Sequence, residues 1–86
     1  MKTYNIRFKK QPEKFIKSRS KGEQKRLLCE IYKLPDCKNV KKMAGYDNRF
    51  RLRIGDTRVI YDKHDDTFII LIVQIGSRGD VYKNME

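Results

Sequence analysis

The fold of this chain is decided by one stretch of sequence, RFRLRIGDTRVIY at positions 49–61. Gly55 and Asp56 are expected to form a two-residue hairpin turn, because a glycine at the first central position matches the twist of the flanking strands. Counting outward from the turn predicts the register, with Arg53 opposite Arg58. The stretch therefore predicts two paired antiparallel strands.

The two faces of this hairpin differ, because side chains alternate along a strand. One face is apolar and comprises Phe50, Leu52, Ile54, Val59 and Tyr61. The other carries Arg49, Arg51, Arg53 and Arg58, with Ile60 and Asp62 among them. Like charges directly opposite destabilise a sheet, which favours an anionic ligand and phosphate above all. The alternative is that arginines on an open sheet face are simply solvated.

Length and composition indicate one folded domain over residues 1–86, with 38% hydrophobic and 37% charged residues. The net charge is +10, and residues 1–53 hold 17 Lys and Arg against 5 Asp and Glu. Such a chain is expected to bind polyanions, with nucleic acid as the first class of partner and acidic protein segments as the second.

Neither a metal nor a cofactor is expected. Cys29 and Cys37 lack the spacing of a zinc site, and His64 is the single histidine. The polar, basic N-terminus has no secretory signal, which favours reduced cysteines and a cytoplasmic protein. The apolar run 68–75 is far shorter than the ~20 residues that span a bilayer, so we expect no membrane contact.

The remaining pattern predicts an α+β fold with the order β-α-α-β-β-β. Residues 3–8 alternate like a half-buried strand, and helices are expected over 12–18 and roughly 21–33, the second one capped by Ser20. A connection over 35–48, a turn over 62–66 and a central strand over 68–73 follow, with a break at 76–80 and a possible short strand after it. The two helices are expected on one face of a twisted antiparallel sheet.

At this point the sequence resembles a known family. The stretch 49–61, followed by IGSRGDVY at 75–82, is similar to the RelE/ParE superfamily of bacterial and archaeal toxins. The resemblance spans nearly the whole chain and implies the toxin of a type II toxin-antitoxin pair. Arg58, Arg78 and Tyr82 match the catalytic arginines and tyrosine of the family, whereas Arg51 and Arg53 stand where well-known RelE members have lysines.

RelE-like members enter the ribosomal A site and cut messenger RNA. The resemblance therefore implies a metal-independent endoribonuclease, in which a ribose 2′-hydroxyl attacks the neighbouring phosphate and leaves a 2′,3′-cyclic phosphate and a 5′-hydroxyl. The predicted catalytic residues are Arg53, Arg58, Arg78 and Tyr82. The predicted RNA-binding residues are Arg49, Arg51, Lys41 and Lys42. Arginine is a poor general base, which leaves Tyr82 or a ribosomal group for that role, and we interpret His64 as a solvated turn residue.

The resemblance also implies the partners: the 70S ribosome with its 16S rRNA, mRNA, and a cognate antitoxin with an acidic amphipathic segment. Operator DNA is expected only for the toxin–antitoxin complex. Two alternatives remain open. One is a ParE-like toxin that binds DNA gyrase without catalysis, although such members generally lack the full set of polar residues. The other is a nucleic-acid-binding module without chemistry.

Overall fold

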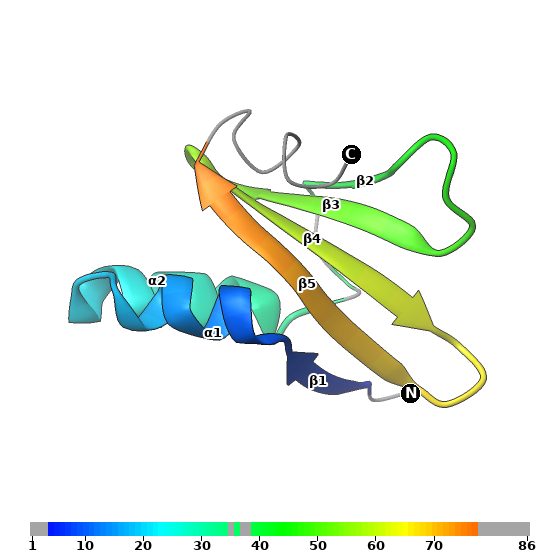
Figure 1. Ribbon diagram of the computed structural model, residues 1–86, viewed down its shortest axis with the longest axis horizontal. Coiled ribbons are helices and arrows are strands. Elements are labelled where there is room, and N and C mark those ends of the chain that lie inside the picture. Colours follow the sequence, from blue (N-terminus) through cyan, green and yellow to red (C-terminus); the bar gives the residue numbers. More distant parts are fainter. Residues whose placement is uncertain (1–3, 35, 37–38, 78–86) are drawn as a thin grey trace.

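The computed structural model describes residues 4–34, 36 and 39–77, and the predicted hairpin lies within its sheet (Figure 1). Strands β3 (Arg49–Ile54) and β4 (Thr57–His64) pair antiparallel in the predicted register, with Arg53 opposite Arg58. Gly55 has a φ of +59°, and Asp56 is not among the positive-φ residues. A positive φ at the first central position alone is typical of a type II′ turn, which confirms the prediction for this hairpin.

The sheet has five strands in the order β1-β5-β4-β3-β2. The predicted α+β class is confirmed, but the sheet is mixed, because β1 (Asn5–Phe8) runs parallel to β5 (Ile69–Ser77). Alternation of side chains predicts which face a strand buries and not the direction in which it pairs. Strand β5 lies inside the sheet, as expected, although β4 is the middle strand.

The segment 35–48, predicted as a connection, contains the edge strand β2 (Val40–Lys42). It pairs antiparallel with β3 and places Val40 opposite Leu52 and Lys41 opposite Arg51. Three residues are too few to show a period, so this strand is defined by backbone pairing with β3 and not by a sequence pattern. The prediction that Lys41 and Lys42 lie in a loop was therefore wrong.

Helices α1 (Lys10–Lys17) and α2 (Lys21–Ile31) pack on one side of the sheet, as predicted (Figure 1). The Ser20 side chain accepts a 3.3 Å hydrogen bond from the Glu23 backbone N–H, which confirms the expected N-cap. The helices and the sheet share one apolar core, made of Ile16, Leu27, Ile31, Leu34, Leu52, Ile54, Val59, Tyr61, Ile70, Ile72 and Ile75.

Two strands are longer than the sequence predicts. Strand β4 continues through His64, and the turn begins only after it, with Phe68 at a φ of +54°. Strand β5 continues to Ser77, past the expected break at Gly76. The possible last strand and the candidate residues Arg78 and Tyr82 lie outside the described residues. Among the described helices, none has the length and apolar character needed to cross a bilayer.

Candidate functional site

The candidate site is the sheet surface opposite the helices, which we call the arginine face. Residues paired across neighbouring strands share a face, so the register defines three rows across this surface. The first row is Arg53, Arg58 and Gly76; the second is Lys41, Arg51, Ile60 and Gln74; the third is Arg49, Asp62 and Leu71. Successive rows are two residues apart, about 7 Å along the strands.

Arg53 and Arg58 form the first row, next to the hairpin turn. Arg53 is exposed and its Nε donates a 3.4 Å hydrogen bond to the Gly55 carbonyl. Arg58 is half-buried, and its Nε atom is buried without a hydrogen-bond partner in the part of the chain that the structure describes. Two guanidinium groups on directly opposed residues repel each other, and an unpaired buried donor costs further free energy. An anion that accepts hydrogen bonds at this row would relieve both costs.

The second row meets β2 at the edge of the sheet. Lys41 lies opposite Arg51, and both line a hollow of about 300 Å³ together with Lys42 and Met43. Lys42 is paired with Phe50, so its position lies on the opposite face of the sheet from Lys41. It nevertheless lines the same hollow, at the edge of the sheet. Three of the predicted RNA-binding residues are thus brought together. Ile60, in the middle of this row, is fully buried.

Arg49, in the third row, is held by a carboxylate. Its Nε and Nη2 donate to Asp62 Oδ1 and Oδ2 at 2.6 and 2.8 Å, and its guanidinium lies 4.9 Å from the Tyr46 ring centroid. The hydrogen bonds to Asp62 raise the pKa of Arg49 above its ordinary value, against the opposing effect of burial. Arg49 therefore ties β3 to β4, and its role in RNA binding stays a prediction.

His64 lies at the far end of β4, where its Nδ1 atom is 3.4 Å from Asn48 Nδ2. Six residues of strand separate it from Arg58, which corresponds to about 20 Å. This distance excludes His64 as a proton acceptor for a phosphate bound at the first row. Within residues 4–34, 36 and 39–77, no cluster of three or more His, Cys, Asp or Glu could hold a metal ion.

Strand β5 contributes two positions to the arginine face that the sequence did not predict. Gln74 lies opposite Ile60. Gly76 lies opposite Arg58 and, as a glycine, has no side chain that could cover Arg58. A bulge between Ile60 and Tyr61 shifts the pairing, since Tyr61 faces Ile72. Counting from the hairpin turn cannot include that shift, although Gly76 at the end of an apolar run was a signal that space is needed there.

Comparisons with known proteins agree with this fold. The sequence model of the family described as ParE toxin of type II toxin-antitoxin system, parDE, matches residues 5–82. No curated protein sequence matches the chain significantly.

Three solved structures illustrate the likeness. The archaeal RelE–RelB complex from Pyrococcus horikoshii is 29% identical, with a TM-score of 0.74 over 92% of this chain and 99% of that one. The RelB–RelE antitoxin–toxin complex from Methanococcus jannaschii is 23% identical, with a TM-score of 0.70 over 93% and 99% of the two chains. The isolated E. coli RelE toxin is 18% identical, with a TM-score of 0.71 over 96% and 95%. At these identities, the Methanococcus jannaschii and E. coli structures show only that the fold is shared.

Proposed function

Because the chain belongs to the ParE toxin family of type II toxin-antitoxin systems, within the RelE/ParE superfamily, we propose that this toxin cuts messenger RNA on the ribosome with its arginine face. The observation that carries the proposal is the first row. Arg53 and Arg58 are directly opposed, and the buried Nε of Arg58 has no hydrogen-bond partner among the described residues. A phosphodiester supplies the acceptors that this arrangement lacks.

The proposed chemistry needs fixed positive charge more than it needs a metal. Attack of a ribose 2′-hydroxyl on its own 3′-phosphate accumulates negative charge on the phosphorus oxygens, and guanidinium groups held by a sheet stabilise that charge without reorganising. We assign this role to Arg53, Arg58 and Arg78, with Tyr82 stacking on the base next to the cut. Arg51, Lys41 and Lys42 hold the adjacent phosphates, and Arg49, which is paired with Asp62, is a further proposed RNA-binding residue.

We assign no residue of the first two rows as the acceptor of the 2′-hydroxyl proton. An arginine stays protonated at any physiological pH, and His64 is about 20 Å from Arg58. The 2′-hydroxyl proton must therefore go to Tyr82 or to a group of the ribosome. A site with cations but no base of its own cleaves slowly on free RNA, because the rate then depends on a substrate held in line by another surface. Dependence on the 70S ribosome and its 16S rRNA follows, and with it a place in the cytoplasm.

The proposed protein partner is a cognate antitoxin. The similar structures from Pyrococcus horikoshii and Methanococcus jannaschii are both complexes of a toxin with its antitoxin. A net charge of +10 favours a partner rich in acidic residues. Operator DNA is proposed as a partner of the toxin–antitoxin complex only.

A second function is favoured by the family match itself, since the matching model describes a ParE toxin. A ParE-like toxin would bind DNA gyrase and would not need the arginine face for catalysis. The two functions are separated by giving purified protein to a reconstituted translation system and to a gyrase supercoiling assay. We expect inhibition of translation at concentrations that leave supercoiling unchanged. Inhibition of supercoiling alone would replace the proposal with the gyrase function.

Two single-residue variants make this experiment specific to the arginine face. Arg58→Ala should abolish the inhibition of translation, because it removes one of the two opposed guanidinium groups. Lys14→Ala removes an exposed cation from α1, on the helix side of the sheet, and should inhibit as the unmodified toxin does. Equal loss in both variants would mean that total charge, and not the arginine face, carries the effect.

A further inference from the structure

The loop that joins β2 to β3 carries an aromatic ring to the border of the arginine face. At its start, the Met43 N–H donates to the Arg49 carbonyl at 2.9 Å, and at its end the Asn48 carbonyl accepts from the Lys63 N–H at 2.9 Å. Between these two points lies Tyr46, which is 37% exposed. The loop is thus tied to the sheet on both sides of an exposed tyrosine.

The Tyr46 ring is held by the third row of the arginine face. The Arg49 guanidinium lies over the ring, 4.9 Å from its centroid. The same guanidinium donates two hydrogen bonds to Asp62, at 2.6 and 2.8 Å, and the Arg49 and Asp62 side chains are only 21% and 14% exposed. A planar guanidinium fixed in this way supports a ring stacked on it. A flat ligand that binds Tyr46 would therefore lose little free energy to the ordering of the protein side chain.

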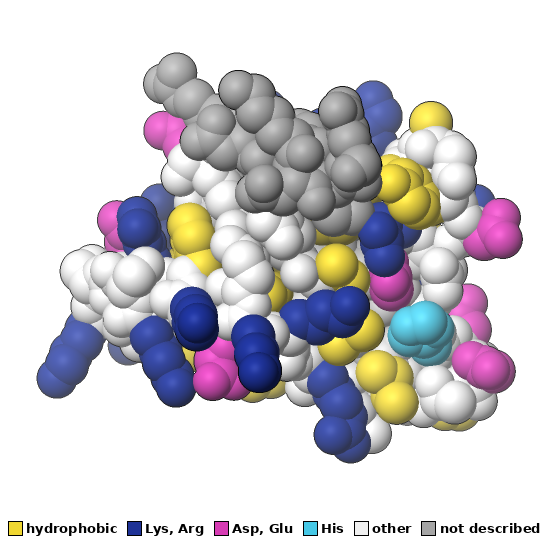
Figure 2. Space-filling view, viewed as in Figure 1, with side chains coloured by type: hydrophobic (Ala, Val, Ile, Leu, Met, Phe, Trp, Pro, Cys, Tyr) yellow, Lys and Arg dark blue, Asp and Glu magenta, His cyan; other side chains and the backbone are white. Residues whose placement is uncertain are grey.

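Positive charge alone does not select the ligand of this ring. Figure 2 shows Lys and Arg side chains gathered over the helices and β1 as well, so attraction for phosphates is spread over much of the molecule. An exposed aromatic ring adds a contact of a different kind, because the unpaired bases of single-stranded RNA stack on aromatic side chains. Such stacking tolerates every base, so Tyr46 would select unpaired RNA and not a particular sequence.

The position of Tyr46 relative to the first row fits a longer stretch of RNA than one phosphate. Arg49 and Arg53 lie two rows apart on β3, which corresponds to about 14 Å. A single strand bound at the first row covers this distance in a few nucleotides. We propose that Tyr46 stacks on an unpaired base of the messenger a few nucleotides from the cut, and that the Arg49–Asp62 pair positions its ring. The proposal rests on RNA as the ligand of the arginine face and not on cleavage.

Binding to a 2′-O-methyl RNA oligonucleotide tests the stacking directly. The blocked 2′-oxygens cannot attack the phosphates, so cleavage does not enter the measurement, which is made by fluorescence anisotropy at one salt concentration. We expect Tyr46→Ala to weaken binding about tenfold, as the loss of one base–aromatic stack does. Tyr46→Phe should bind like the unmodified toxin, and Tyr46→Leu, which keeps apolar bulk without a ring, should bind like Tyr46→Ala. Unchanged affinity of Tyr46→Ala would overturn the proposal.

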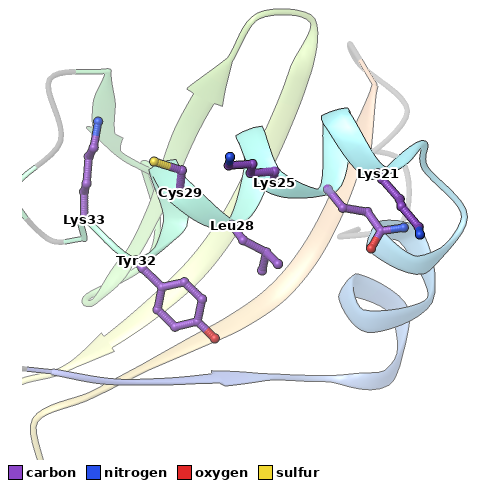
Figure 3. Close-up of a pocket in the computed structure, with 7 residues that line it drawn as sticks. Lys21, Lys25, Leu28, Cys29, Tyr32 and Lys33 are labelled. Carbon is purple, nitrogen blue, oxygen red and sulfur yellow. The ribbon is translucent and has the colours of Figure 1, made fainter.

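Tyr32 provides the matched control. It is 59% exposed and lies at the end of α2 beside Leu28, on the helix side of the sheet (Figure 3). Tyr32→Ala should leave the affinity for the oligonucleotide unchanged. Equal weakening by Tyr32→Ala and Tyr46→Ala would overturn the proposal, because the effect would then not belong to the arginine face. Weaker binding of Tyr46→Ala to the antitoxin with unchanged binding to RNA would overturn it too, and would make Tyr46 a protein contact.

Removing the bases of the oligonucleotide one at a time locates the stacked base, since an abasic nucleotide keeps its phosphate. One abasic position should weaken binding of the unmodified toxin about tenfold and have no effect on binding of Tyr46→Ala. Asp62→Asn removes a negative charge and loosens Arg49, so it should bind the intact oligonucleotide more tightly but lose part of the abasic effect. A purely structural role of Asp62 would not separate these two quantities. Equal abasic effects in the unmodified toxin and Tyr46→Ala would contradict the stacking.

The outcomes separate this proposal from the proposed function. If the unmodified toxin does not bind the oligonucleotide, RNA is not the ligand of the arginine face and both proposals fail. If the unmodified toxin binds the oligonucleotide and cuts messenger RNA on the ribosome while Tyr46→Ala behaves identically, only the stacking role of Tyr46 fails.

Discussion

Arg58 is the described residue on which the proposed chemistry depends most. It is half-buried in the middle strand, between Arg53 on β3 and Gly76 on β5. A lysine at this position keeps one positive charge but loses the planar fork of donors that binds two phosphate oxygens. The position therefore separates the contribution of charge from that of hydrogen-bond geometry.

We predict that Arg58→Ala lowers the rate of RNA cleavage by roughly 100- to 1000-fold, the usual cost of removing one donor to a developing oxyanion. Arg58→Lys should recover only part of this loss. Single-turnover cleavage with saturating ribosomes is the measurement, since it isolates the chemical step from binding. Full activity of Arg58→Ala would remove Arg58 from the catalytic set.

The hairpin turn is the element that sets the register of the arginines, and it is constrained from two sides. Gly55 has a φ of +59°, and a Cβ added there would lie 3.0 Å from Arg26 Nη2. Gly55→Ala should therefore destabilise the protein by about 1–2 kcal/mol, because an alanine is strained in the left-handed region. The matched control is Gly22→Ala in α2, where nothing lies within 4 Å of the added Cβ.

Urea unfolding of the two glycine variants gives the comparison. Gly22→Ala should leave stability unchanged or raise it by roughly 0.5–1 kcal/mol, since alanine favours a helix. Loss of stability in both variants to the same degree would contradict the special role of the turn.

Gln11 connects helix α1 to the last part of strand β5. Its side-chain amide donates to the Ile75 carbonyl at 2.8 Å and accepts from the Ile75 N–H at 2.9 Å, and so replaces a strand partner beyond the end of β1. Ile75 precedes Gly76, which lies opposite Arg58. Gln11 thereby fixes the strand that borders the first row of the arginine face.

We predict that Gln11→Met destabilises the protein by about 1–2 kcal/mol, because two hydrogen bonds to a buried backbone are lost. It should also speed hydrogen exchange at the Ile75 amide. Gln24→Met removes a comparable bond, from Gln24 Nε2 to the Arg19 carbonyl at 2.8 Å, but on the loop between the helices. If both variants leave exchange at Ile75 unchanged, Gln11 does not hold the strand.

Sequence alone was most informative where local chemistry determines geometry. Gly55 fixed the turn, and counting from it gave the register of β3 and β4 and the opposition of Arg53 to Arg58. It was least informative where partners lie far apart in the chain: the parallel pairing of β1 with β5, the three-residue β2, and the bulge near Ile60 all depend on the assembled sheet. The hydrogen bonds that Asp62 accepts from Arg49 were not predicted from the sequence either.

At the scale of the whole molecule, the positive charge is divided between two surfaces with different surroundings. The arginine face combines opposed guanidinium groups around the buried Ile60, whereas the outer side of α2 combines Lys21 and Lys25 with the exposed Tyr32. The first arrangement suits phosphates.

We propose that the arginine face cuts messenger RNA on the ribosome. The decisive experiment is primer extension on messenger-programmed 70S ribosomes, with the unmodified toxin, Arg58→Ala, Arg78→Ala and the control Lys14→Ala. We predict new 3′ ends within the A-site codon for the unmodified toxin and Lys14→Ala, and none for the two arginine variants. Intact messenger in the presence of a toxin that still arrests growth would contradict the claim.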